Sequence, residues 1–312
     1  MLHSFVNTDV YLLKIKQIRR FMLLESELIL NPDGSIYHLH LRPEQLAPVV
    51  FTVGDPERVG QVSRHFDRIE CKIRKREFVT HTGWLGGQRL SVISTGIGPD
   101  NIDIVLNELD ALVSFDLKTR QLHDTPGQLT LIRLGTSGSI RPEIPVDSLV
   151  VSAGAFGFDG VLHFYDAPVL WQNDWVAALE NYAAAQGHDF PARPYFAAAD
   201  ADLLRRFSGD FQPGITATNI GFYAPQARQL RAPARHPGYL SFLQSFDFQG
   251  YKITNLEMET AAILGFAQLL GHRAISLNAI LANRADGTFS RNPARTVRRM
   301  IERSMEIIAV QP

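Results

Sequence analysis

Short apolar runs alternate with stretches of helical periodicity along most of this chain. The runs are rich in Val, Ile and Leu and are mostly followed closely by glycine, which is typical of strands in a buried sheet. Between them, apolar residues recur every three or four positions, which predicts amphipathic helices with one buried face. The predicted strands are 48–53, 90–94, 129–134, 148–153 and 274–282, and the predicted helices are 59–66, 102–112, 260–270 and 297–308.

This alternation predicts an α/β fold, a three-layer α/β/α domain with helices covering a central sheet. No polar linker divides the chain, so we take 22–312 as a single domain. Residues 1–21 mix basic and apolar positions without a long apolar run or a small-residue cleavage site, and we interpret them as an N-terminal tail. A targeting helix is the alternative for this segment. In such folds, binding sites form on loops beyond the strand ends.

The charge composition argues against partners that are attracted by a large net charge. The 312 residues include 31 Lys and Arg against 32 Asp and Glu, so no overall field attracts nucleic acid or an anionic membrane. A bound phosphate must therefore be held by a few placed cations. The longest apolar stretch, 261–270, is too short to span a bilayer, and the single cysteine, Cys71, cannot form an internal disulfide. We expect a soluble, cytoplasmic protein.

Two glycine-containing segments beside an arginine are candidates for binding an anion. Gly54-Asp55-Pro56-Glu57-Arg58 follows the first predicted strand, and Arg133-Leu134-Gly135-Thr136-Ser137-Gly138 ends the third. Glycine lets the backbone approach an anion closely, the Thr136 hydroxyl can donate, and the planar fork of arginine matches phosphate oxygens. Each segment alone is more typical of a tight turn. A third segment, Gly96-Ile97-Gly98-Pro99, lacks the third glycine and the acidic residue of a dinucleotide-binding motif.

Two further segments carry side chains suited to a sugar and a base. Glu257-Met258-Glu259 opens the predicted helix 260–270, where carboxylates interact well with the helix dipole. The same carboxylates can accept hydrogen bonds from ribose hydroxyls while the thioether packs on the sugar. Gln226 and Arg228 share one face if their segment is extended. The Gln226 amide matches the O2 and N3–H edge of uracil, Arg228 can donate to O4, and Phe222 can stack on the ring.

In their order along the chain, these segments resemble the nucleoside phosphorylase-I family, and within it the members that cleave uridine. The resemblance runs from about Ser35 to the C-terminal helix and implies a phosphorylase/hydrolase-like fold whose central mixed sheet is partly barrel-like. It implies a pentosyltransferase that converts uridine and phosphate reversibly into uracil and ribose 1-phosphate, in pyrimidine nucleoside salvage. Inorganic phosphate is then a co-substrate, no cofactor or metal is assigned, and neither nucleic acid nor membrane is a partner.

The resemblance also implies a role for each matching residue. The family supplies the arginine and the histidine that match Arg76 and His38 from a neighbouring subunit, so we expect a homo-oligomer, either a dimer with shared sites or a hexamer of such dimers. Phosphate binding is assigned to Gly54, Arg58, Arg76, Arg133 and Thr136, ribose binding to His38, Glu257, Met258 and Glu259, and base binding to Phe222, Gln226, Arg228, Leu281, Ala282 and Arg284.

The chain departs from the family pattern at three places. The loop Gly96–Asp100 is one residue shorter, which leaves open a structural potassium site formed with Glu77. Ala224-Pro225 replaces a Pro-Gly pair in the base-binding loop and changes its stiffness. Asp286 lies near, although past, the position at which purine-cleaving relatives use an aspartate. Purine phosphorolysis, cleavage by water and a non-catalytic nucleoside-binding protein are the alternatives.

Overall fold

Strands and helices alternate in the computed structural model, which describes residues 22–310; the predicted tail 1–21 lies outside them. The strands are β1 Val49–Val53, β2 Arg68–Lys75, β3 Phe78–Leu85, β4 Gln88–Ser94, β5 Phe115–Asp116, β6 Gln121–Leu122, β7 Thr130–Ser139, β8 Leu149–Phe158, β9 Tyr195–Ala198, β10 Gln212–Asn219, β11 Asp247–Phe248, β12 Tyr251–Glu257, β13 Arg273–Asn283 and β14 Thr288–Phe289. The helices are α2 Pro56–Ser63, α3 Pro99–Ser114, α4 Asp174–Ala185, α5 Ala201–Phe207, α6 Tyr239–Ser245, α7 Thr260–Leu270 and α8 Pro293–Ala309, and the 3-10 turns are η1 Pro43–Gln45, η2 Val161–Phe164, η3 Pro168–Leu170 and η4 Ala224–Gln226.

The central sheet is part barrel and part open sheet. Strands β12, β10, β8, β13 and β7 pair in that order, and β12 pairs back with β7, which closes a five-stranded barrel. From β7 the sheet continues outward through β1, β4 and β3 to the edge strand β2. Both parallel and antiparallel neighbours occur, as between β13 and β7 or β8. The predicted mixed, partly barrel-like sheet is therefore confirmed.

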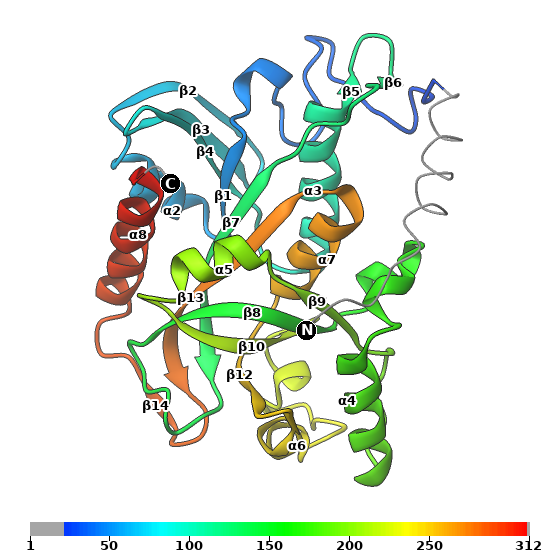
Figure 1. Ribbon diagram of the computed structural model, residues 1–312, viewed down its shortest axis with the longest axis vertical. Helices are drawn as coiled ribbons and strands as arrows, with labels where there is room; N and C mark the ends of the chain where they lie inside the picture. The colour runs from blue at the N-terminus through cyan, green and yellow to red at the C-terminus, as the bar shows by residue number, and fades with distance from the viewer. Residues whose placement is uncertain (1–21, 311–312) are drawn as a thin grey trace.

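Helices cover both faces of the sheet because its central strands are apolar on both sides. In β1, Val50 packs in a core with α3 and α7, whereas the next residue, Phe51, packs in a second core with α2, α5 and α8. Successive side chains of a strand point to opposite faces, so one core lies on each face of the sheet. Each core fills the space between the sheet and the helices that cover it, which gives a three-layer fold. Figure 1 shows α8 and α2 on one side of the sheet and α3 and α7 on the other. Within residues 22–310, none of the helices has the length and apolar character needed to cross a membrane.

One predicted boundary is wrong in a way that affects the site. The third predicted strand was expected to end at Leu134, but β7 continues through Gly135 to Ser139. The extra residues pair with β13 on one side, and Gly138 pairs with Leu256 of β12 on the other. The glycines therefore lie within a strand, where barrel closure supplies their hydrogen-bonding partners. Thr136 and Ser137 are consequently held by a rigid element and do not belong to a loop.

Candidate active site

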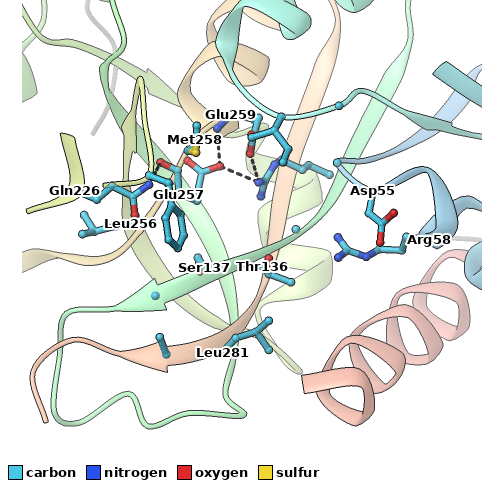
Figure 2. A pocket seen from close by; sticks show the side chains of 18 of the residues that line it. Asp55, Arg58, Thr136, Ser137, Gln226, Leu256, Glu257, Met258, Glu259 and Leu281 are labelled. Carbon is cyan, nitrogen blue, oxygen red and sulfur yellow. Dashed lines mark hydrogen bonds and ion pairs between the residues drawn. The ribbon is translucent and has the colours of Figure 1, made fainter. Parts of the chain in front are cut away.

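A cavity of about 570 Å³ opens where β1, β4, β10 and β12 end. Figure 2 shows Glu257, Met258 and Glu259 along one wall, Thr136 and Ser137 on β7, and Asp55 and Arg58 farther along. The residues that line the cavity are Gly54, Asp55, Pro56, Arg58, Gly96, Ile97, Arg133, Gly135, Thr136, Ser137, Gly138, Phe222, Gln226, Arg228, Leu256, Glu257, Met258, Glu259, Leu281, Ala282 and Phe289.

Most of the residues predicted from the sequence meet in this cavity, although they are spread over more than two hundred positions of the chain. Three predicted residues do not line it: His38, Arg76 and Arg284. Those that do are Gly54, Arg58, Arg133 and Thr136 of the phosphate set, Glu257, Met258 and Glu259 of the ribose set, and Phe222, Gln226, Arg228, Leu281 and Ala282 of the base set.

The start of α2 forms one end of the cavity. Asp55 caps this helix by accepting a hydrogen bond from the Glu57 amide at 2.9 Å, and Pro56 occupies the first turn, where a missing N–H costs nothing. This places Arg58 in the first turn of the helix, with its Nη1 donating to the Leu134 carbonyl at 3.1 Å. Burial lowers the pKa of Arg58, and Asp55 opposes that shift. The guanidinium is therefore anchored beside the open cavity and is only partly paired with acidic groups.

Arg133, which the sequence assigned to phosphate binding, contacts both carboxylates that it assigned to ribose binding. It is 7% exposed, and its Nη2 lies 2.6 Å from Glu259 Oε2 and 3.0 Å from Glu257 Oε2. The Nη1 donates to Asn278 Oδ1 at 3.2 Å. The guanidinium lies against Gly135, where a Cβ atom would be 1.9 Å from Nη1, so a larger residue there would displace the guanidinium. The sequence placed Arg133 among the phosphate ligands but did not reveal that it pairs with both carboxylates.

The two carboxylates combine helix capping with a place in the cavity wall. Glu257 Oε2 accepts the backbone N–H groups of Glu259 and Thr260 at 2.8 Å each, which satisfies the start of α7, and its Oε1 accepts the Thr218 hydroxyl. Glu259 Oε1 accepts the Gly98 amide at 2.8 Å. Burial raises the pKa of Glu259, and the charge of Arg133 opposes this increase. The helix-dipole interpretation and the ligand-binding interpretation of this segment are compatible.

The base-binding segment is not extended, which corrects the prediction that Gln226 and Arg228 share a strand face. Gln226 ends the 3-10 turn η4, and Ala227 has a left-handed φ of 55°. The two side chains nevertheless meet, because Arg228 Nη1 donates to Gln226 Oε1 at 2.7 Å and to the Phe222 carbonyl at 2.8 Å. The Arg228 guanidinium lies 3.9 Å from the centroid of the Phe222 ring. A hydrogen bond and a cation–π contact therefore produce the arrangement that strand geometry was expected to supply.

Arg284 supports this loop from outside the cavity. Its Nη1 and Nη2 donate to the carbonyl oxygens of Gln226 and Ala227 at 3.0 and 3.2 Å. Burial lowers the pKa of Arg228 to about 10, with a further contribution from the charge of Arg284. Arg228 is still a cation at neutral pH, and the loss of solvation makes its charge more effective toward a ligand.

His38 and Arg76 do not line the cavity of their own chain. His38 Nδ1 is 2.7 Å from Glu108 Oε1, and the same carboxylate accepts the backbone N–H groups of His38 and Leu39 at 2.8 to 3.0 Å. The carboxylate thereby holds Nδ1 and leaves Nε2 for another partner. Arg76 is exposed in the turn between β2 and β3, with a left-handed φ of 54°.

Sequence reasoning missed several residues of the cavity wall. Ile97 and Phe289 are apolar and yet 70% and 64% exposed, which places large apolar groups at its mouth. Phe289 arrives there because β14 folds back on β13, with Ala282 opposite Phe289. The signal for that hairpin was the Asp286-Gly287 dipeptide, which is typical of tight turns between strands. Among the described residues, no group of three or more His, Cys, Asp and Glu side chains is placed to hold a metal ion.

Comparison with known proteins agrees with this geometry. A family model for the phosphorylase superfamily matches residues 48–310. The chain is 30% identical over 283 residues to the uridine phosphorylase of Thermococcus kodakarensis, covering 89% of this chain and 88% of that protein. It is 27% identical over 257 residues to the uridine phosphorylase of Haemophilus influenzae, covering 80% and 87%. A DeoD-type purine nucleoside phosphorylase of Myxococcus xanthus is 26% identical over 280 residues, covering 88% and 98%.

A solved structure gives the same result at the level of the backbone. The crystal structure of a Trypanosoma brucei nucleoside phosphorylase, described as showing uridine phosphorylase activity, matches with a TM-score of 0.80 and 27% identity over 91% of this chain and 98% of that chain. Agreement over nearly the full length of both chains extends to the barrel as well as to the open sheet. The chain therefore belongs to the phosphorylase superfamily, as a nucleoside phosphorylase most like the uridine phosphorylases.

Proposed function

We propose that this protein catalyses the reversible phosphorolysis of uridine, giving uracil and ribose 1-phosphate. The observation that carries the proposal is one cavity with three chemically distinct regions in a row. Arg58 and Thr136 form a donor-rich region, Glu257 and Glu259 a carboxylate region, and the Gln226 loop an amide and guanidinium region. These match phosphate, ribose hydroxyls and a uracil edge.

The mechanism follows from charge placement. As the bond between C1′ and N1 stretches, the ribose becomes cationic and uracil becomes anionic. Phosphate bound beside Arg58 and Thr136 faces the developing cation and forms the new bond to C1′, while the base leaves with the bonding electron pair. Arg228 donates to the uracil oxygen on which negative charge accumulates. Such preorganised donors stabilise the transition state without a covalent enzyme intermediate.

The arrangement of Gln226 supports a pyrimidine as the base. Gln226 is 2% exposed and its Oε1 is held by Arg228, so the amide cannot rotate freely. Nε2 is then the donor for uracil O2, and the second lone pair of Oε1 is the acceptor for N3–H. A site that hydrogen-bonds a base edge in this way discriminates strongly against bases that leave its buried groups unpaired.

The purine alternative depends on an aspartate that protonates N7, and Asp286 is poorly suited to that task. It lies exposed in the turn before β14 and does not line the cavity. The Thr288 hydroxyl and amide donate to Asp286 Oδ1 at 2.7 and 2.9 Å, and they lower its pKa. We expect Asp286→Asn to leave uridine turnover within about twofold of wild type, as for surface changes away from a site. Loss of inosine cleavage in this variant would contradict the assignment.

The direct test is ultraviolet-monitored cleavage of uridine, thymidine and inosine, each with and without inorganic phosphate. We expect uridine to be cleaved only when phosphate is present and to be preferred over inosine. Steady cleavage of uridine without phosphate would indicate a hydrolase. Uridine binding without products at any phosphate concentration would indicate a nucleoside-binding protein.

We also propose that 22–312 functions as one domain and that active sites are shared in a homo-oligomer. Gly54 and Phe289, near the two ends of the domain, line the same cavity, which supports the first statement. The second is supported by His38, which Glu108 orders although it contacts nothing in its own cavity. The exposed Arg76 is consistent with the same arrangement, since the next residue, Glu77, lies beside the cavity-lining Gly96, where a Cβ would be 3.5 Å from the Glu77 side chain.

Mixing two inactive variants tests the shared site. We expect His38→Ala and Arg228→Ala each to be inactive, and their co-expressed mixture to regain about a quarter of wild-type activity, because half of random dimers are mixed and one of their two sites is intact. The assay is uridine phosphorolysis per active-site concentration. A mixture as inactive as its components, or full activity in His38→Ala alone, would show that His38 does not complete a neighbouring site.

A further inference from the structure

The interior of the five-stranded barrel is polar where a small barrel is usually filled by apolar side chains. Each barrel strand contributes at least one polar group to it. Apart from Arg133, which is 7% exposed, these groups are fully buried. They are Arg133 on β7, Ser152 on β8, Thr216 on β10, Asn255 on β12 and Asn278 on β13.

Hydrogen bonds join these groups across the barrel. Asn255 Nδ2 donates to the Ser137 hydroxyl at 3.1 Å, and Asn255 Oδ1 accepts the Thr216 hydroxyl at 3.2 Å. The hydroxyls of Thr216 and Ser152 are 2.7 Å apart. Asn278 Nδ2 donates to the Ser152 hydroxyl at 3.2 Å. We call this chain of bonds, from Ser137 to Asn278, the barrel network.

One end of the barrel network lines the active-site cavity, and the other end contacts a residue that lines it. Ser137 lines the cavity directly, and at the other end Asn278 Oδ1 accepts a hydrogen bond from Arg133 Nη1 at 3.2 Å. Because Nδ2 of Asn278 is engaged by Ser152, its carbonyl oxygen is turned toward the guanidinium. Ser276 adds a weaker acceptor for the same nitrogen at 3.4 Å. The orientation of Asn278 is therefore set by residues that do not touch the cavity.

We infer that Asn278 is a positioning residue that, through the barrel network, holds Arg133 in the orientation needed to bind phosphate. The inference rests on the proposed function, in which Arg133 is a phosphate ligand. Glu257 and Glu259 both attract Nη2 of Arg133. Asn278 is the stronger of two neutral acceptors for Nη1, the other being Ser276, and two held nitrogens fix the plane of a guanidinium. The donors that remain keep one direction, so that phosphate meets them without reorganisation.

The hydrogen bond between Asn278 and Nη1 of Arg133 gives a physical reason for the polar interior of the barrel. Buried amide and hydroxyl groups cost free energy unless each is hydrogen-bonded, and an apolar filling avoids that cost. An apolar residue at 278, however, leaves Nη1 of Arg133 with only the weaker Ser276 acceptor at 3.4 Å, while the carboxylates hold Nη2. The guanidinium then turns more easily about its contact with Glu257 and Glu259, and phosphate has to compete with them for its donors.

The test measures binding of inorganic phosphate by calorimetry in the full-length protein, together with steady-state kinetics. In Asn278→Leu, we expect phosphate affinity to fall about tenfold, the effect of one hydrogen bond to a charged group. We expect the phosphate KM to rise in parallel and the uridine KM to stay within about twofold, because the base-binding loop is untouched. A purely structural role would lower the melting temperature without separating the two KM values.

Asn283→Leu is the matched control. Asn283 is on the same strand and 1% exposed, but it donates to the carbonyls of Arg141 and Ile144 and has no bond to the barrel network. We expect it to lower the melting temperature and leave phosphate affinity unchanged. If Asn278→Leu does not fold, Ser152→Ala provides the test, since it removes the group that orients Asn278 and is expected to weaken phosphate binding about two- to threefold.

The outcomes separate this inference from the proposed function. Wild-type phosphate affinity in folded Asn278→Leu, or in Ser152→Ala when the first variant does not fold, would overturn the positioning role. A wild-type protein that binds phosphate without cleaving uridine would refute the proposed function and leave the binding comparison valid. A wild-type protein that binds no phosphate would overturn both.

Discussion

Replacing Arg228 with alanine is expected to lower kcat/KM for uridine at least a hundredfold while the protein stays folded. Arg228 is half-buried, and its guanidinium is held by the Gln226 side chain and by the Phe222 carbonyl and ring. It is therefore aimed before substrate binds, and an aimed donor to a developing anion contributes about 3 to 4 kcal/mol to lowering the barrier. Its removal also frees the Gln226 amide, so part of the loss reflects misplacement of that side chain.

The measurement is uridine phosphorolysis by purified Arg228→Ala, with circular dichroism and thermal unfolding to verify the fold. Arg231→Ala is a suitable control, because Arg231 is an exposed arginine in the same loop and does not line the cavity. We expect it to retain wild-type rates. Arg228→Lys should recover little, since an ammonium group keeps the charge but lacks the planar fork that reaches Gln226 and Phe222 together. Near-normal activity of Arg228→Ala would refute the role of Arg228.

Replacing Arg133 with methionine is expected to have the largest effect on stability and to abolish phosphorolysis. The variant leaves Glu257 and Glu259 buried without a cation, because Arg133 is the guanidinium that pairs with both. Removing one partner of a buried ion pair costs about 3 to 5 kcal/mol of unfolding free energy. Urea unfolding monitored by fluorescence measures this loss, and phosphate calorimetry measures the loss of the ligand site.

The loss of unfolding free energy in Arg133→Met is expected to depend on pH. Burial already raises the pKa of Glu259 above its ordinary value of 4.5, and the charge of Arg133 opposes this shift. Without Arg133, the pKa rises further. The folded variant then binds a proton that the unfolded chain has released, so its stability is highest below the ordinary value and falls as pH rises through the raised pKa. We expect a smaller deficit at pH 5 than at pH 8, and equal deficits would contradict this account.

A second substitution distinguishes the contribution of Glu259 to this pH-dependent loss of stability from that of Glu257. In Arg133→Met combined with Glu259→Gln, the buried carboxylate at 259 becomes a neutral amide that can still accept from the Gly98 amide. We expect the double variant to recover part of the lost stability at pH 8 and to show a weaker pH dependence, because the remaining charge on Glu257 is held by two backbone amides and the Thr218 hydroxyl. Recovery of activity is not expected.

The sequence alone determined the elements whose signals are local. Helix α7 begins and ends at the predicted residues, because its apolar run is bounded by the acidic segment at Glu257 and by Gly271, whose left-handed φ of 77° ends the helix. The motifs also identified most of the predicted residues that meet in the cavity, because their order along the chain resembles a family pattern although each segment alone is typical of a turn or a helix start.

Only the tertiary structure decided how those residues face one another. The end of β7, the pairing of β12 with β7 and the hairpin that places Phe289 depend on strands distant in sequence, and so does the contact of Arg133 with Glu259, 126 residues away. Periodicity reports which face of an element is buried, whereas the hydrogen-bond partner of a buried charge is fixed by barrel closure. For this reason the sequence named most of the predicted residues that meet in the cavity, and the fold alone showed that one arginine holds both carboxylates and is itself held by an asparagine inside the barrel.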